Sequence, residues 1–177
     1  MPSEQSKKPV IPSKQGDVDL LQDPVAQQLL QSKSLAHLAY NWHDGTPRVV
    51  PIGFYWNGLE IVMATATDAP KTKVLKNGAK VAVTIEHDSS PPKILQIRGT
   101  VHTDTVEGLA PEYVANAHRT LSEEDAQAFL AESARLYPSM TRIFIHPDWV
   151  GLLDFETRLP SAVERAIKRT SEATGEV

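Results

Sequence analysis

Alternating hydrophobic and polar residues in the middle of the chain predict a mainly β structure built from antiparallel strands. Val81, Val83 and Ile85 alternate with polar residues, and the segment 93–104 repeats this pattern. A strand with one apolar and one polar face is typical of an antiparallel sheet or barrel wall. A proline interrupts the last strand, so we expect a bulge or bend at residues 146–148. The six predicted strands span 35–42, 48–56, 59–67, 80–88, 93–104 and 140–155.

Capping signals predict helices at two places among these strands. Asp23 and Pro24 combine a helix cap with a first-turn proline, and Asp68 with Pro70 repeats the combination. We therefore expect one helix to begin near residue 24 and another to span 70–77.

The apolar spacing becomes helical after Pro111 and indicates further helices in the last third of the chain. Ser122 and Asp125 resemble a capping box, which predicts a second helix that ends before Pro138. Ser161 opens a last helix. Because no βαβ alternation is present, the pattern favours an α+β class over a parallel sheet.

Composition divides the chain into a polar tail and one folded domain. Residues 1–18 are polar and contain three prolines, which predicts a flexible N-terminal tail. Residues 19–177 fall within the usual size of a single domain and include the C-terminal helix. We therefore expect one barrel domain rather than two.

Overall charge and hydropathy narrow the function classes. The 177 residues carry a net charge of −4, whereas broad affinity for nucleic acid needs a basic surface. No apolar run approaches the roughly 18 residues of a membrane span, and the first residues lack the apolar stretch of a secretory signal. The absence of cysteine excludes disulfides, thiol catalysis and thiolate metal ligands. We expect a cytoplasmic protein with a small-molecule substrate and with neither nucleic acid nor a membrane as partner.

Common catalytic and metal-binding motifs are missing. The nine glycines form neither a GxGxxG nor a GxxxxGK[ST] loop, and no GxSxG elbow is present. The six histidines never occur as HxH or HExxH, so we predict no metal site; ligands assembled from separate strands are the alternative. No side chain stands out as a general acid or base, so the sequence identifies no catalytic residue.

A tight turn links the second and third predicted strands. Asn57 and Gly58 tolerate the positive φ angles that a two-residue type I′ turn requires. Both strands are rich in β-branched and aromatic residues, which suit a half-buried sheet. We therefore expect a central β-hairpin over residues 48–67.

Hydroxyl and basic side chains follow one another where the third strand ends. Thr65, Ala66 and Thr67 close the strand, and Lys71 and Lys73 lie in the first turn of the helix expected next. Hydroxyls, free amide N–H groups at a helix start and a lysine together suit an anion such as phosphate. The alternative is a structural hairpin followed by a solvated lysine turn.

Three local features of the chain occur together in one known fold family. The first is the strand GTPRVVP at residues 45–51, and the second is Thr65 followed by the segment from Lys71 to Leu75. The third is the strand pair KVAVTIE and ILQIRGTV. These features resemble the FMN-binding split barrels of the pyridoxamine 5′-phosphate oxidase-like superfamily. The resemblance covers about residues 29–155 and implies a six-stranded antiparallel split barrel with flanking helices that forms a homodimer.

The resemblance also implies a cofactor site. In the family, the matching threonine and lysine contact the ribityl phosphate, and the backbone of the matching second strand contacts the isoalloxazine ring. Val50 and Ile52 equally suit the core of any barrel. Trp149 is implied to stack on the cofactor of a partner subunit, with a core or interface tryptophan as the alternative. The implied cofactor-binding residues are Val49, Val50, Pro51, Ile52, Thr65, Ala66, Thr67, Lys71, Lys73 and Trp149.

One departure from the family weakens the implied phosphate site. Many relatives place an arginine near the matching lysine, and Ala69 and Pro70 occupy those positions here. We expect Lys73 or Arg48 to substitute for the missing guanidinium; the alternative is a degenerate site. For a 5-deazaflavin coenzyme with its anionic polyglutamate tail, Lys73 and Arg98 are the implied contacts.

The resemblance implies a flavin-dependent oxidoreductase. Its cofactor is FMN or a 5-deazaflavin coenzyme, held in a groove at a homodimer interface, and hydride passes to or from a small organic substrate. The aromatic residues Phe54, Tyr55 and Trp56 support a subunit interface. Pyridoxamine 5′-phosphate oxidase activity itself is not expected, because the chain lacks the basic C-terminal Arg-x-His motif. The alternative is a non-enzymatic flavin- or haem-binding sensor or carrier with the same fold.

Overall fold

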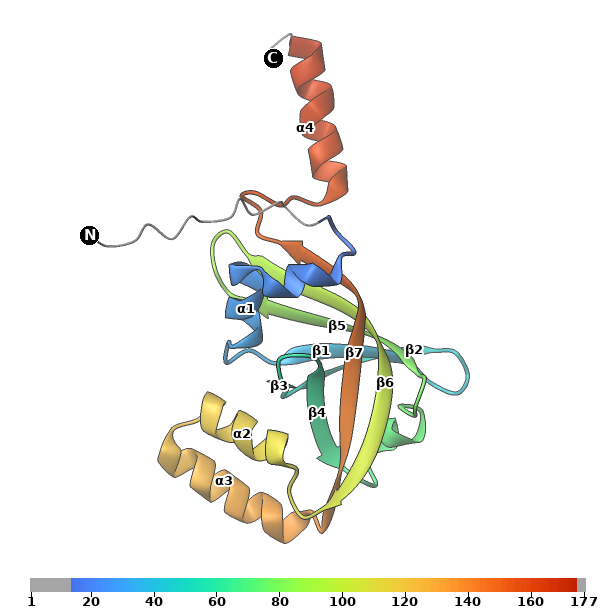
Figure 1. Ribbon diagram of the computed structural model, residues 1–177, viewed down its shortest axis with the longest axis vertical. Coiled ribbons are helices and arrows are strands. Elements are labelled where there is room, and N and C mark those ends of the chain that lie inside the picture. Colours follow the sequence, from blue (N-terminus) through green and yellow to red (C-terminus); the bar gives the residue numbers. More distant parts are fainter. Residues whose placement is uncertain (1–13, 175–177) are drawn as a thin grey trace, which may run out of the picture.

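The computed structural model describes residues 14–174, in which a seven-stranded antiparallel sheet forms a split barrel (Figure 1). The strand order is β2-β1-β5-β6-β7-β4-β3, and every pairing is antiparallel. β2 and β3 lie at opposite ends of this order but follow each other in the chain, so the sheet curls with an open seam. The strands are β1 (Ala36–Asn41), β2 (Pro47–Ile52), β3 (Tyr55–Trp56), β4 (Ile61–Ala66), β5 (Lys80–His87), β6 (Lys93–Glu107) and β7 (Ser139–Leu153).

Alternate residues of the strands fill the barrel with one hydrophobic core, which confirms the predicted period of two. Val83, Ile97 and Ile145 are at most 1% exposed. Two N-terminal helices, η1 (Val18–Gln22) and α1 (Pro24–Leu30), add buried leucines to this core, Leu20 and Leu29 among them. The α1 helix begins where the sequence predicts, because the Asp23 carboxylate accepts the Val25 N–H at 2.9 Å.

The predicted single strand 48–56 and the predicted count of six strands are wrong, because the chain bends at Gly53 and Phe54. β2 ends at Ile52 with β1 as its partner, whereas β3 pairs with β4 on the other wall of the barrel. Phe54 crosses between the two walls and is 1% exposed, packed in the core. Burial of this side chain therefore divides a run with continuous β propensity into two strands.

The predicted turn at Asn57-Gly58 is shifted by one residue. The Asn57 N–H donates to the Glu60 carbonyl at 3.2 Å, so Gly58 and Leu59 form the turn. Gly58 has a φ of +96°, and Asn57 is not in the left-handed region. The Asn57 side chain accepts the N–H groups of Leu59 and Glu60, a local bond that favours asparagine in the position before the turn.

The predicted helix over 70–77 is wrong: only a 3₁₀ turn, η2 (Pro70–Lys73), forms. Its preceding residue is Ala69, and no side chain caps it, so the predicted cap at Asp68 is also wrong. The buried Thr72 hydroxyl bonds to the carbonyls of Thr67 and Ala69 and ties the turn to the end of β4. The chain then leaves for β5, because the Gly78 N–H bonds to a β6 carbonyl.

Two helices inserted between β6 and β7, α2 (Pro111–Thr120) and α3 (Glu123–Leu136), form where the sequence predicts them. Ser122 caps α3 by accepting the Asp125 N–H at 3.1 Å, as the capping box predicts. Both helices lie on the β4 side of the barrel, whereas the last helix, α4 (Ser161–Thr174), projects away from it (Figure 1). Across the described residues, no helix is long and apolar enough to span a membrane.

The predicted irregularity at residues 146–148 is confirmed. Arg98 pairs with Trp149 and the next β6 residue, Gly99, pairs with Pro147, so Asp148 is the extra residue of a bulge in β7.

Residues 14–17, which belong to the predicted tail, lie along the far end of β7. β4 pairs with β7 only as far as Ile145. Beyond that point the Gly16 N–H donates to the Val150 carbonyl at 2.7 Å. The Gln15 side-chain amide accepts the Leu152 N–H at 2.9 Å and donates to the Leu152 carbonyl at 2.6 Å. The first 13 residues of the predicted tail lie outside the described residues.

Candidate functional site

The structure brings Lys71 and Thr65 together at the end of β4. The Lys71 amine donates to the Thr65 hydroxyl at 3.0 Å, and the lysine side chain is half-buried. Burial lowers the pKa of the Lys71 ammonium group. No carboxylate within the described part of the chain forms an ion pair with it. The result is a partly desolvated cation beside a hydroxyl donor.

The neighbouring candidates are arranged differently. The Thr67 hydroxyl bonds to that of Ser139 at 3.0 Å, and Ala66 and Thr67 line a cavity of about 500 Å³ next to the start of β7. Lys73 is exposed and makes no hydrogen bond or ion pair to any described residue. The Ala69 and Thr72 N–H groups are already bonded to carbonyls within the turn. An anion site here therefore depends on the side chains of Lys71 and Thr65 rather than on a helix terminus.

The second candidate segment, Val49 to Ile52, lies on β2 at the edge of the sheet. β2 pairs only with β1 among the described strands, so one side of its backbone has no strand partner. Val49 is 61% exposed, whereas Val50 and Ile52 are half-buried against the core. No described hydrogen bond or ion pair joins this segment to Lys71.

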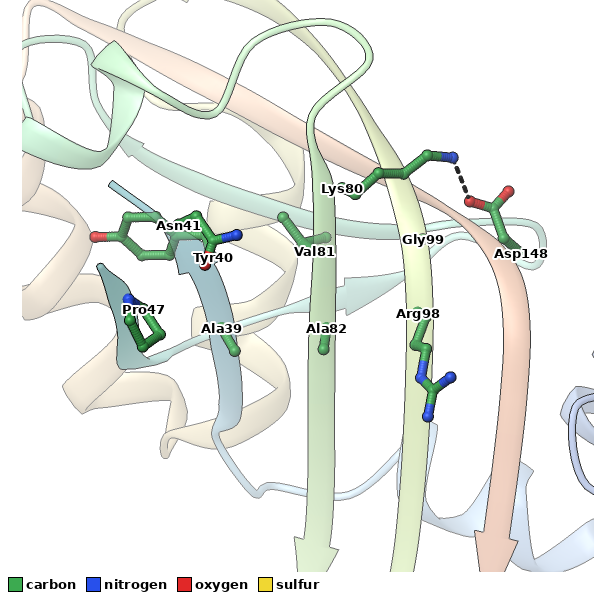
Figure 2. A pocket seen from close by; sticks show the side chains of 10 residues that line it. All are labelled: Ala39, Tyr40, Asn41, Pro47, Lys80, Val81, Ala82, Arg98, Gly99 and Asp148. Atoms are coloured by element: carbon green, nitrogen blue, oxygen red, sulfur yellow. Dashed lines mark hydrogen bonds and ion pairs between the residues drawn. The ribbon is translucent and has the colours of Figure 1, made fainter. Parts of the chain in front are cut away.

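The outer face of the sheet carries a hollow that Figure 2 shows from close by. Ala39 pairs with Val49 on one side and with Ala82 on the other, and the two alanines form part of the lining of a hollow of about 420 Å³. Arg98 lies at one side, stacked over the Trp149 ring at 4.2 Å. Lys80 and Asp148 form an ion pair at 3.0 Å at the rim of the hollow (Figure 2).

Trp149 is far from the Lys71 site within one chain. Thr65 pairs with Thr141 on β7, eight residues before Trp149, which corresponds to roughly 26 Å along a strand. The Trp149 ring packs against Gly151 and Gly16, where an added Cβ would lie 2.5 and 2.7 Å from it. Any contact of Trp149 with a cofactor at Lys71 would need a second subunit.

Two of the three aromatic residues expected to form a subunit interface lie in the core instead. Phe54 is 1% and Trp56 is 9% exposed, and only Tyr55 remains half-buried. The strand break at Gly53 turns both side chains inward. The exposed Val49 and the alanine hollow beside it are the apolar surface that this part of the molecule offers.

A second cavity, which sequence reasoning missed, lies between α2 and the sheet. It has a volume of about 320 Å³, and the exposed side chains of Leu35, Leu121 and Phe129 lie in its lining. Tyr113 and Phe129 stack with ring centroids 5.6 Å apart. The remaining lining residues are Ile52, Gly53, Phe54, Val62, Ala64, Glu112, Asn116, Ala117 and Thr120.

Arg119 fixes the orientation of the Asn116 side-chain amide, which lies in the lining of this cavity. One guanidinium nitrogen donates to the Phe54 carbonyl at 2.8 Å and to the Asn116 side-chain oxygen at 2.7 Å. Because arginine only donates, the amide nitrogen of Asn116 must be the end that faces away from it. The other terminal nitrogen of Arg119 is buried with no hydrogen-bond partner in the described part of the chain, and burial lowers the pKa of the guanidinium group. No described carboxylate pairs with Arg119.

Gly53 is the one sequence signal for this cavity. A Cβ at that position would lie 2.6 Å from the Asn116 amide nitrogen, so only glycine permits the approach. A glycine inside a β-rich run often marks such a close contact. Its partner on α2 is more than 60 residues away in the chain, so no local pattern identifies it.

The remaining titratable residues that the structure describes do not cluster as metal ligands. No group of three or more histidine, aspartate or glutamate side chains within residues 14–174 is arranged to hold a metal ion. His102 and His146 each place Nδ1 3.6 Å from the same oxygen of Glu60, and both rings are exposed. Burial alone would raise the pKa of Glu112 at the edge of the α2 cavity, but the hydrogen bonds and charge of Arg142, together with a backbone hydrogen bond, lower it.

The family model described as pyridoxamine 5′-phosphate oxidase matches residues 22–152. No curated protein matches the chain.

Several solved structures share the fold. An F420 reductase is 24% identical with a TM-score of 0.55, and the match covers 71% of this chain and 94% of that one. A conserved hypothetical protein from Mycobacterium tuberculosis is 16% identical with a TM-score of 0.57, covering 81% and 91%. The haem storage protein HutZ from Vibrio cholerae is 17% identical with a TM-score of 0.52, covering 75% and 93%. At these identities the likeness establishes the split-barrel fold.

Proposed function

The chain belongs to the pyridoxamine 5′-phosphate oxidase family, and we propose that it is an oxidoreductase that binds FMN or a 5-deazaflavin coenzyme. Lys71 and Thr65 hold the cofactor phosphate, and the β2 segment from Val49 to Ile52 lies along the ring. The bound cofactor supplies hydride chemistry, and the protein supplies position and electrostatics.

The unpaired Lys71 amine is the observation that carries this proposal. Desolvation disfavours the charge of a half-buried ammonium group, so an anionic partner stabilises it. The only described side-chain partner of Lys71 is the Thr65 hydroxyl. A phosphate dianion supplies the missing charge and restores the pKa that burial lowers, and the hydroxyl adds a neutral donor.

The edge position of β2 supports the ring contact. One side of its backbone lacks a strand partner among the described residues, so its peptide groups are free for the polar edge of a ring system. The half-buried Val50 and Ile52 side chains offer apolar contact on the core side. This segment therefore combines backbone donors and acceptors with an apolar wall.

We expect the protein to form a homodimer through the outer face of β1, β2 and β5. The exposed Val49 stands beside the hollow lined by Ala39 and Ala82 on the same face. A twofold axis here would place the valine of one protomer in the hollow of the other, a self-complementary contact. In such a pair Trp149, stacked under Arg98 on this face, is available to the partner's site.

Cofactor titration of Lys71→Ala tests the phosphate site. We expect FMN, or the deazaflavin coenzyme, to bind the wild-type protein and to bind the variant about tenfold to a hundredfold more weakly, as for loss of a charged hydrogen bond of about 1.5–3 kcal/mol. Flavin fluorescence measures both affinities. We expect Lys73→Ala to weaken binding less than Lys71→Ala, because Lys73 is exposed and is not held beside Thr65.

Two outcomes would contradict the proposal. Equal affinity of wild type and Lys71→Ala for both cofactors would show that the amine does not hold the phosphate. A purified protein with a Soret band and no affinity for either flavin would point to a haem carrier instead.

Light scattering tests the dimer separately. We expect a mass of two chains at micromolar concentration and a single chain for Ala82→Arg, which fills the hollow with a charged side chain. A monomeric wild-type protein would remove the shared groove from the proposal.

A further inference from the structure

We propose that the cavity under α2 is a binding site for an uncharged cyclic carbonyl compound, whose oxygen accepts a hydrogen bond from Asn116. In the context of the proposed function this compound is the substrate, so the inference rests on that function for its role. The binding itself depends only on residues of this chain.

The size and lining of the cavity limit the ligand to a small, mostly apolar molecule. Its volume of about 320 Å³ is at the lower end of ligand pockets. Leu35, Leu121 and Phe129 are 38–54% exposed around it, which is unusual for large apolar side chains that lie together. One or two rings fill such a space and cover these side chains.

The charges around the cavity exclude an ionic ligand. Glu112 is the one charged residue among the described lining residues, and it is already paired with Arg142. Arg119 is not in the lining, so no described cation faces the cavity to bind an anionic group. A cationic ligand would meet the unpaired guanidinium of Arg119 behind Asn116. The apolar walls also favour a neutral molecule, because they cannot solvate a charge.

The Asn116 amide is the group that orients the ligand. Arg119 holds its oxygen at 2.7 Å, which leaves the amide nitrogen as a donor in the cavity lining. That nitrogen makes no hydrogen bond to any described residue. A carbonyl oxygen is the complementary group, and the nearby positive charge of Arg119 strengthens the N–H as a donor.

The position of the cavity relates it to the proposed cofactor site. Ile52 and Gly53, at the end of the strand assigned to the ring, are part of its lining. Gly53 has no side chain to separate the Asn116 nitrogen from the strand. A ligand in this cavity therefore lies next to the end of the ring-binding strand rather than at the phosphate end.

Binding of 1-indanone, a bicyclic ketone, tests the site without any catalytic readout. Ligand-observed NMR measures its affinity for the cofactor-free protein, with indane as the analogue that lacks the carbonyl. We expect indane to bind about three- to tenfold more weakly than 1-indanone, as for one neutral hydrogen bond. We expect Asn116→Asp, which replaces the donor by an acceptor, to remove this preference for the ketone.

Asn57→Asp is the matched control, because Asn57 uses only its oxygen in the β3–β4 turn and lies outside the cavity lining. If Asn116→Asp fails to fold, Leu121→Gln replaces it: this exposed rim residue contributes apolar contact, so both ligands should bind more weakly. An unchanged ketone preference in Asn116→Asp, or unchanged affinities in Leu121→Gln, would overturn the proposal.

Repeating the titration with FMN present separates this inference from the proposed function. Simultaneous binding of FMN and 1-indanone supports a cavity beside the cofactor. Competition between them would overturn the inference, because it would show that the cavity is part of the cofactor-binding site. Binding of 1-indanone to a protein that binds neither flavin would support the cavity and contradict the oxidoreductase proposal.

Discussion

The end of β4 and the underside of α2 each hold a half-buried cation that has no carboxylate partner among residues 14–174, but the two cations use their charge differently. Lys71 makes one described hydrogen bond, to Thr65, and its amine remains able to meet an external anion. Arg119 uses its guanidinium to hold the Phe54 carbonyl and the Asn116 amide. The first region suits a charged group of a ligand, and the second presents a neutral amide whose orientation the charge fixes.

Arg158, in contrast to Lys71 and Arg119, is a cation paired with two carboxylates. Its guanidinium pairs with Asp23 before α1 and with Asp154 after β7, and all three side chains are at most 18% exposed. We expect Arg158→Met to lower the free energy of unfolding by about 2–3 kcal/mol, because two largely buried carboxylates lose their cation. Urea unfolding measures the change. Lys168→Met, which removes an exposed ion pair on α4, is the control and should cost less than about 0.5 kcal/mol.

Acid should weaken the same paired region. Burial alone would raise the pKa of Asp154, but hydrogen bonds from Thr157 and from the N–H groups of residues 156–158 outweigh it, so the pKa lies well below its ordinary value. A lowered carboxyl pKa stabilises the fold above the unfolded value of about 4 and loses that contribution as the pH falls further. Melting temperatures between pH 5 and 2 should therefore fall more steeply for wild type than for Asp154→Asn. Parallel curves would contradict this.

Replacing Arg119 should have a smaller effect on stability. Arg119→Met removes two hydrogen bonds but also an unpaired buried charge, so we expect a loss of about 1 kcal/mol in thermal or urea unfolding. FMN affinity should stay within twofold of wild type, because this arginine serves the α2 cavity. A large loss of FMN affinity would mean that both cations serve one ligand.

Lys71→Met should leave stability within about 0.5 kcal/mol of wild type at neutral pH, because the amine forms no ion pair with a described residue. Burial lowers the pKa of Lys71, so wild type should gain stability relative to the variant as the pH rises toward the unfolded value of 10.5. Paired urea titrations at pH 7 and 10 check both statements. A clear loss of stability at pH 7 would show a structural rather than a ligand-binding lysine.

The two regions also differ in how far the sequence reveals them. Lys71 and Thr65 are six residues apart on either side of one bend, so local spacing was enough to predict that they lie at the same place in the fold. Asn116 and Arg119 meet Gly53 and Phe54 only because α2 packs on the sheet, and single-sequence patterns carry no information about that packing. The same limit explains the strand count, since burial of Phe54 in the core ends β2 where propensity alone continues it.

Predictions that depended on one element failed where a neighbouring element intervened. The helix expected over 70–77 stops at Lys73, because Thr72 bonds back to the strand and Gly78 bonds to β6. The alternating strands 80–88 and 93–104 were predicted well, because each buries one face against the same core. Periodicity thus predicts the barrel walls, and contacts between elements decide the bends between them.

The Gln15 side chain also bears on whether the edge of β7 can pair with a strand of another molecule. An unpaired strand edge exposes a row of peptide groups that can template the addition of a strand from another molecule. At the far end of β7 the Gln15 amide occupies both peptide groups of Leu152, while the Gly16 N–H occupies the carbonyl of Val150. Gln15 and Gly16 therefore occupy part of an edge that β4 is too short to cover, so a strand from another molecule cannot pair with these peptide groups.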